Sequence, residues 1–163
     1  NVRNTLLAKP VYNAYRMLSR LDTTWLDVSG ASLGDKVRAV ATASEDRRRL
    51  TVMVYNHNSG DPESNEQAES VELLVKNLPF AGQVKVTSYI IDSTHSDVYS
   101  AWGKTGSPAY KEITMEQVQQ IKAHDSLETS APESTVNVAK GGTWSAKLVL
   151  DPNSVALFLL SAQ

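Results

Sequence analysis

The sequence predicts a mainly β protein: an antiparallel β-sandwich of about eight strands, with a short N-terminal helix and one helical insertion. Two observations carry this prediction. After residue 22, short runs alternate apolar and polar side chains, which is typical of strands with one buried face. Gly, Pro, Asn and Asp at turn positions separate these runs. A chain of 163 residues is long enough to form one domain with its own core.

The N-terminal segment follows a different pattern from the rest of the chain. Pro10 suits the first turn of a helix, because its missing N–H would have no partner there. Apolar residues then recur at helical spacing on one face: Val11, Ala14, Tyr15, Leu18 and Leu21. We therefore expect an amphipathic helix whose apolar face packs against a partner.

The predicted strands fill most of the remaining sequence. Clear patterns cover residues 37–43, 50–55, 71–75, 84–91, 144–150 and 155–160, and weaker ones cover 25–28 and 135–139. The run at 155–160 is apolar on both faces, which predicts a central strand covered by two layers. Residues 126–134 read as a surface connection.

One helix is expected to interrupt the strands. Thr114 can cap its start, and Gln117 stands three residues later, which together form a capping box. Met115, Val118 and Ile121 then give a narrow apolar stripe. We expect this helix to pack on the edge of the sandwich.

Composition limits the classes of function. The chain has no cysteine, so it has no thiol nucleophile and no disulfide framework. Its 16 basic and 18 acidic residues give no broad positive field for nucleic acid or an anionic membrane. No apolar run approaches the roughly 20 residues of a membrane span. We expect a soluble protein, cytoplasmic or secreted.

The usual motifs of catalysis and of metal or cofactor binding are missing from the sequence. The three histidines are scattered without ligand-like spacing, so no metal site is predicted, and no phosphate-binding glycine loop indicates a cofactor. Asn65–Glu66 resembles the pair that carries the general acid of many retaining glycosidases. A general acid needs a raised pKa in a buried site, whereas this pair lies in a polar loop. No catalytic residue is predicted.

Residues 91–108 are the richest candidate for a functional segment, since loops this specific often carry function. Asp92, His95 and Asp97 could form an acid–base group, or the Asp and Ser-Thr-His-Ser residues could stabilise the loop by hydrogen bonds to their own backbone. Tyr99, Trp102 and Tyr110 could stack on a sugar or pack at an interface. Both alternatives remain open for each group.

Two segments resemble glycoside hydrolase family 39, which holds β-xylosidases and is related to α-L-iduronidases. Residues 9–18, KPVYNAYRML, are similar to the helix that closes the family's catalytic barrel. Residues 92–108, with His95-Ser96-Asp97 and Ala101-Trp102, are similar to part of its C-terminal β-sandwich, although Asp97 stands where the family typically has Asn. The two segments occur in the family's order.

The resemblance implies a division into residues 1–22, like the last barrel helix, and residues 23–163, an accessory β-sandwich. The family's two catalytic glutamates lie on a (β/α)8 barrel, which alone needs about 250 residues. We therefore expect a non-catalytic accessory domain that supports the barrel through Val11, Tyr15 and Leu18 and docks through residues 91–108. The alternative is a stand-alone carbohydrate-binding module for xylan-type sugars. A homo-oligomer is possible in either case.

Overall fold

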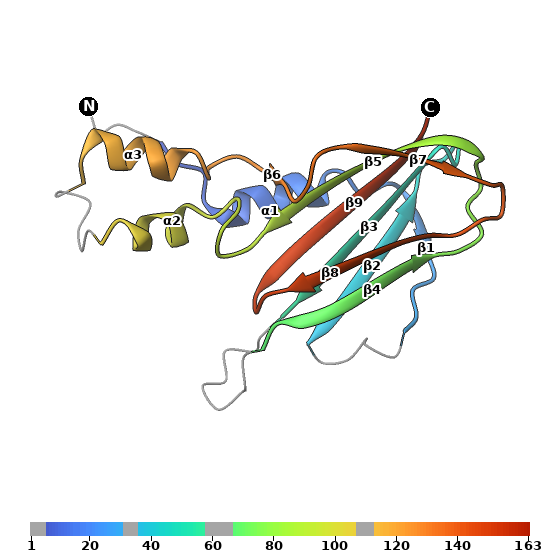
Figure 1. The fold of residues 1–163 in the computed structure, drawn as a ribbon, viewed down its shortest axis with the longest axis horizontal. Helices are drawn as coiled ribbons and strands as arrows, with labels where there is room; N and C mark the ends of the chain where they lie inside the picture. The colour runs from blue at the N-terminus through green and yellow to red at the C-terminus, as the bar shows by residue number, and fades with distance from the viewer. Residues whose placement is uncertain (1–5, 31–35, 58–66, 107–112) are drawn as a thin grey trace.

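The computed structural model describes residues 6–30, 36–57, 67–106 and 113–163. Within these ranges the chain forms two antiparallel sheets, with three helices grouped toward one end (Figure 1). The larger sheet has the order β1-β2-β3-β9-β5-β6, and β7 pairs with the other end of β5. Its strands are β1 (Thr24–Leu26), β2 (Val37–Ala43), β3 (Arg49–Asn56), β5 (Gly82–Ile91), β6 (Glu128–Thr129), β7 (Ser134–Val138) and β9 (Ser154–Ala162).

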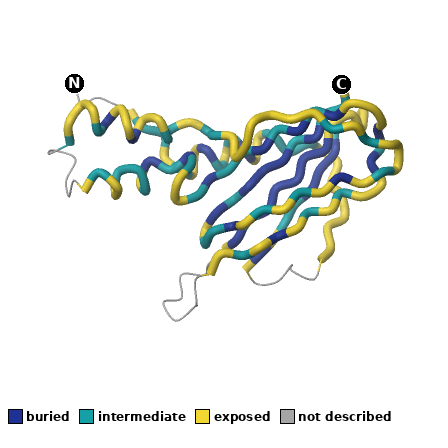
Figure 2. The backbone as a smooth tube through the Cα atoms, in the orientation of Figure 1, coloured by how far each residue is buried: buried dark blue, intermediate teal, exposed yellow. Residues whose placement is uncertain are grey.

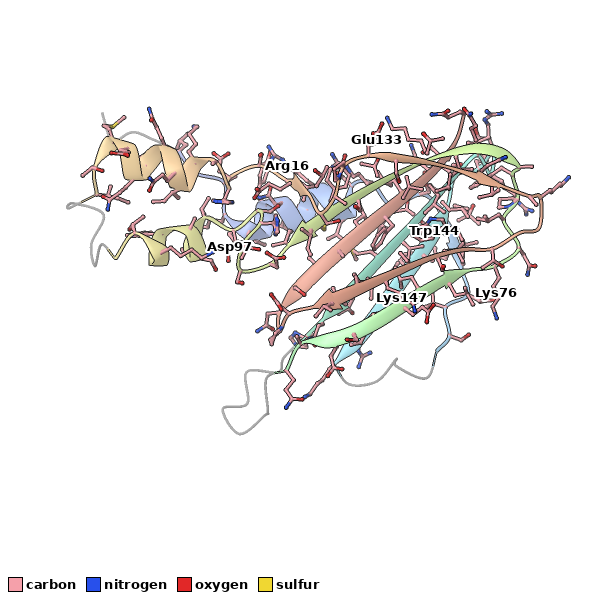
Figure 3. All side chains as sticks on the ribbon, in the orientation of Figure 1. Arg16, Lys76, Asp97, Glu133, Trp144 and Lys147 are labelled. Atoms are coloured by element: carbon pink, nitrogen blue, oxygen red, sulfur yellow. The ribbon has the colours of Figure 1, made fainter. Side chains whose placement is uncertain are left out.

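The smaller sheet pairs β4 (Glu69–Val75) with β8 (Trp144–Leu150) and covers one face of the larger sheet. The main core lies between the two sheets. There the Trp144 and Phe158 rings approach to 5.6 Å between centroids, and Leu150 and Leu160 have no exposed surface. Figure 2 shows the buried residues concentrated along the strands of the larger sheet, and Figure 3 shows Trp144 on the smaller one. The predicted mainly β fold is confirmed.

Strand β9 occupies the centre of the larger sheet, between β3 and β5. Its side chains alternate between the two faces, and both are covered, so Leu157 is as fully buried as Leu160. This confirms the central position that the apolar run at 155–160 predicts.

Helix α1 (Pro10–Leu18) covers the second face of the larger sheet. Met17 is fully buried and packs with Met53, Ile91 and Leu157. The predicted apolar face divides in two. Ala14 and Leu21 pack against this cluster, whereas Val11, Tyr15 and Leu18 are 57%, 65% and 45% exposed.

Two elements were not expected from the sequence. Helix α2 (Val98–Lys104) forms inside the segment 91–108, and β6 forms inside the stretch 126–134, which was read as a plain surface connection. The predicted helix α3 (Met115–Lys122) is present with its capping box. It packs beside α2 in a helical arm, here defined as residues 97–106 and 113–124, and this arm extends beyond the sheets (Figure 1). The expected position on the sandwich edge was therefore wrong, because the apolar stripe of α3 finds its partner in α2.

No helix in the described ranges is both long enough and apolar enough to cross a membrane.

Candidate docking site

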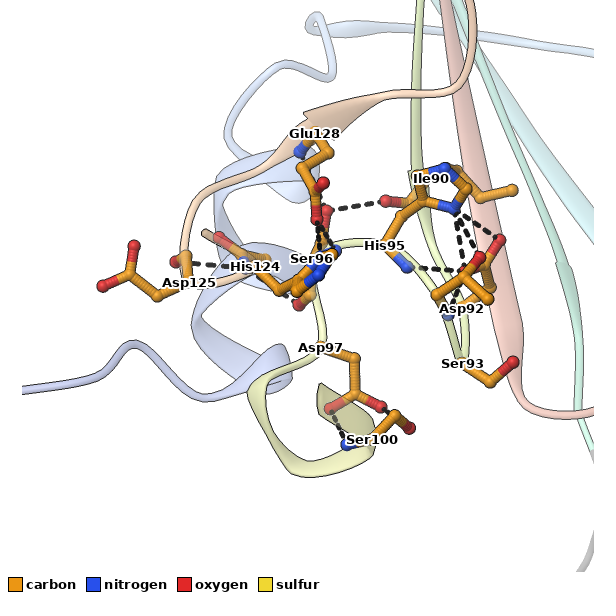
Figure 4. Close-up of polar contacts among 12 residues, drawn as sticks. Ile90, Asp92, Ser93, His95, Ser96, Asp97, Ser100, His124, Asp125 and Glu128 are labelled. Atoms are coloured by element: carbon orange, nitrogen blue, oxygen red, sulfur yellow. Dashed lines mark hydrogen bonds and ion pairs between the residues drawn. The ribbon is translucent and has the colours of Figure 1, made fainter. Parts of the chain in front are cut away.

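The segment that follows β5 begins with a tight turn held by Asp92 (Figure 4). The Asp92 carboxylate accepts hydrogen bonds from the backbone N–H groups of Thr94 and His95 at 2.7 and 2.8 Å. It also accepts one from the Thr94 hydroxyl at 2.8 Å, and the Asp92 N–H donates to the His95 carbonyl at 3.1 Å. These are the loop-stabilising hydrogen bonds that the sequence offered as one of two roles for Asp92.

The Asp92 carboxylate also lies 3.0 Å from Nδ1 of His95, whose side chain is 40% exposed. Partial burial raises the pKa of Asp92, but hydrogen bonds from Thr94 and His95 outweigh it, so the net pKa is lowered. A carboxyl group with a lowered pKa is ionised at neutral pH and holds no proton to donate. The Asp92 carboxylate therefore stabilises the turn, and its contact with Nδ1 also orients the His95 ring.

Ser96 is the centre of a second, buried group of hydrogen bonds. Its side chain has no exposed surface, and its backbone takes a left-handed conformation at φ 57°. The hydroxyl donates to the Ile90 carbonyl and accepts from the Glu128 N–H, both at 2.8 Å. The Ser96 N–H donates to the Glu128 carboxylate in return. Ser96 thus connects β5 to β6, which lies after the arm in the chain.

Asn13 brings helix α1 into the same group. It is fully buried, and its amide donates to the carbonyls of Ser96 at 3.0 Å and Asp125 at 3.4 Å. The Glu128 carboxylate oxygen that accepts from the Ser96 N–H also lies 3.1 Å from Nδ1 of His124. We call Asn13, Ser96, His124 and Glu128 the joint, because together they connect α1, the sandwich and the arm (Figure 4).

Sequence reasoning did not identify the joint as a unit. It joins segments that are distant in the chain: Asn13 and Ser96 are 83 positions apart. The one available signal was Asn13, a polar residue four positions before the apolar Met17 and therefore on the same side of α1.

Two of the aromatic candidates, Tyr99 and Trp102, lie on helix α2 of the arm. Asp97 caps α2 by accepting from the N–H groups of Tyr99 and Ser100 at 2.9 and 3.3 Å (Figure 3). Tyr99 is 53% exposed, and the Lys9 ammonium lies 6.0 Å from the centre of its ring. Trp102 is half-buried. Tyr110 lies outside the described residues.

Exposed apolar side chains are concentrated in one stretch of the chain. Among the described residues, most of the exposed large hydrophobic side chains come from residues 6–28: Leu6, Val11, Tyr12, Tyr15, Leu18, Trp25, Leu26 and Val28. Exposed apolar side chains that form a contiguous patch mark interaction sites on protein surfaces. Within the described ranges, no three His, Asp or Glu side chains converge as a metal site.

The fold defines a β-sandwich module. One side of its helix α1 packs on the sheet, and the other side exposes apolar residues. The chain belongs to the glycosyl hydrolases family 39, whose family model matches residues 1–141. The resemblance seen in residues 9–18 and 92–108 is thereby confirmed.

Several solved structures of glycoside hydrolases are similar in fold to this chain. The chain is 20% identical to a GH39 enzyme from Xanthomonas axonopodis pv. citri, with a TM-score of 0.72 over 95% of this chain and 30% of that one. A monomeric β-xylosidase from Caulobacter crescentus CB15 is 23% identical, with a TM-score of 0.73 over 94% and 31% of the two chains. A bacterial orthologue of human α-L-iduronidase is 16% identical, with a TM-score of 0.79 over 98% and 28%.

At these identities the likeness is one of fold, and the chain spans less than a third of the length of these relatives. Comparison with curated proteins gives no match.

Replacing Asn13 tests the joint. Asn13→Ala leaves the buried Ser96 carbonyl without its amide donor, which should cost about 1–3 kcal/mol of unfolding free energy. The loss should be uneven. Compared with the unsubstituted chain, hydrogen exchange should accelerate more at the backbone amides of the arm than at those of β9. Asn137→Ala on the exposed side of β7 is the matched control, with an expected change within about 0.5 kcal/mol. Uniform acceleration across the chain would contradict a role specific to the joint.

The lowered pKa of Asp92 predicts an acid-dependent loss of stability. Its folded pKa lies below the unfolded value of about 3.9, so its contribution is complete above that pH and disappears as the pH falls toward the folded pKa. Urea unfolding between about pH 5 and pH 2.5 should therefore show a shallower pH slope for Asp92→Asn than for the unsubstituted chain. Glu72→Gln, at an exposed carboxylate, should leave the slope unchanged. Equal slopes for Asp92→Asn and the unsubstituted chain would refute the stabilising role.

Proposed function

We propose that this chain is the non-catalytic accessory β-sandwich of a retaining family 39 glycoside hydrolase of the β-xylosidase type. It braces the catalytic (β/α)8 barrel, and it docks on it through α1 and the segment 91–108. The catalytic glutamates belong to the barrel, which at about 250 residues does not fit beside a sandwich in 163.

The observation that carries this proposal is the exposed apolar side of α1. Val11, Tyr15 and Leu18 remain 57%, 65% and 45% exposed, although α1 already buries Met17 on the sheet. Full burial of one such large side chain contributes about 1.5–3 kcal/mol, so a partner surface on this side gains free energy that the sandwich alone does not provide. The length of the relatives supports a barrel as that partner, because their chains are about three times longer than the matched region.

The joint supports the second contact of the proposal. Asn13 hydrogen-bonds α1 to Ser96 and Asp125, at the two chain segments where the arm begins and ends. A barrel seated on α1 would then meet the arm in a defined position.

Carbohydrate binding by the isolated chain is the second candidate. The observation in its favour is the exposed Tyr99 ring beside the Lys9 ammonium on the arm, since aromatic rings stack on the apolar faces of sugars. Trp102 and Tyr110 are the other aromatic candidates, with Asp92 and His95 as polar groups nearby in sequence.

Charge substitution on α1 tests the docking proposal. Tyr15→Lys should change the stability of the 163-residue chain by no more than about 0.5 kcal/mol, because Tyr15 is 65% exposed there. In the native polypeptide that carries the barrel, the same substitution places a charge in a packed contact and should cost roughly 2 kcal/mol or more. Urea unfolding of both forms measures the difference. Leu74→Lys, 53% exposed on the smaller sheet, is the control. If the two substitutions behave alike in the native polypeptide, α1 is not the docking surface.

Substitution of Trp102 separates docking from sugar binding. Under the docking proposal, Trp102→Ala lowers the melting temperature of the chain and leaves any affinity for xylo-oligosaccharides unchanged, since the half-buried ring serves packing. Calorimetric titration with xylohexaose and thermal unfolding measure the two quantities. Trp25→Ala, at an exposed tryptophan outside the arm, is the matched control. Measurable binding that Trp102→Ala abolishes without a change in melting would favour the carbohydrate-binding module instead.

A further inference from the structure

A shallow apolar groove lies beside α1 on the face of the larger sheet that this helix covers. Its volume is about 270 Å³, and it is open to solvent. One wall is formed by α1 and the floor by β3 and β9, with these apolar lining residues: Ala14, Met17, Leu18, Met53, Tyr55 and Val155.

The groove exists because one helix is narrower than this sheet. A helix about 10 Å wide covers about two strands spaced at 4.8 Å, whereas β2, β3, β9 and β5 all present side chains to this face. The register places Val40 opposite Met53, and Tyr55 opposite Val155, on the α1 side. Met53 is buried by α1, but Val40, Tyr55 and Val155 remain half-buried. A strip of the sheet beside α1 is therefore uncovered, and the exposed Arg38, opposite Tyr55, lies at its β2 side.

Trp25 lies on the edge strand of this face, beside Thr42, and is not part of the groove lining. It pairs with Thr42, and the Thr42 hydroxyl accepts a hydrogen bond from the N–H of Asp22, in the link that leaves α1. Trp25 therefore stands on the same face of the sheet as α1, where it is 70% exposed. We call the uncovered strip with the half-buried Val40, Tyr55 and Val155 the seat.

We propose that this strip receives a helix of the catalytic barrel, packed alongside α1; this inference rests on the proposed function. Leu18 lines the groove and also belongs to the exposed side of α1, so the two surfaces are continuous. The helices of a (β/α)8 barrel form a ring, and neighbouring helices pack at about 8–10 Å. A barrel that docks on α1 therefore brings a helix over the adjacent strip. The groove is shallow and open to solvent, whereas small-molecule sites enclose most of the ligand surface, so it fits apolar side chains of such a helix better than a ligand.

Thiol labelling tests the seat, because the chain has no cysteine of its own. Single cysteines are introduced as Tyr55→Cys in the floor and Tyr15→Cys on the outer side of α1. Val149→Cys, at a residue 59% exposed on the smaller sheet, is the control. Reaction rates with a maleimide are compared between the 163-residue chain and the native polypeptide, with the unsubstituted polypeptide as background. Val40→Cys gives a second reporter of the floor should Tyr55→Cys fail to fold.

We expect the native polypeptide to slow labelling at both Tyr55→Cys and Tyr15→Cys by about 10-fold or more, with no change at Val149→Cys. Protection of Tyr15→Cys alone would overturn the second-helix seat while leaving docking through α1 intact. Fast labelling at both positions would overturn the seat and the docking proposal together. Protection that disappears on dilution would assign the strip to a second copy of the chain, which also overturns the inference.

Discussion

The double burial of β3 and β9 is the constraint on which the rest of the structure depends. Val54 and Leu160 point to one side of the sheet and Met53 and Leu157 to the other, and all four are nearly or fully buried. A sheet that is apolar on both faces needs two covering layers. The smaller sheet supplies one, and α1 supplies the other. Helix α1 is therefore part of the sandwich, whatever else it contacts.

This constraint explains how one short helix can face two partners. Its buried side, Asn13 and Met17, is fixed by the sheet and by the joint, so the remaining side has a fixed direction as well. Val11 and Tyr15 are held on a rigid support instead of a flexible extension. Preorganised surfaces of this kind lose less conformational entropy on docking.

The sequence was sufficient where local pattern decides the structure. Period-two alternation located the eight expected strands, and the capping box at Thr114 located α3. The sequence was insufficient where contacts between residues distant in the chain decide the structure. Ser96 and Glu128 hydrogen-bond reciprocally across 32 residues, and neither has a pattern of its own. Helix α2 could have been recognised from Asp97, a good capping residue, but the loop-like composition of residues 91–108 concealed it.

The incomplete cover of the larger sheet couples folding to docking. A partner that binds only the folded sandwich stabilises it by mass action, and a partner in the same polypeptide acts at a high effective concentration. Under the proposed function, the barrel would cover the half-buried Tyr55 and Val155, which explains why the sandwich tolerates them. Leu18, which borders both the outer side of α1 and the groove, would contribute to each contact. A single barrel face across α1 and the adjacent strip accounts for both uncovered surfaces, whereas a sugar on the arm accounts for neither.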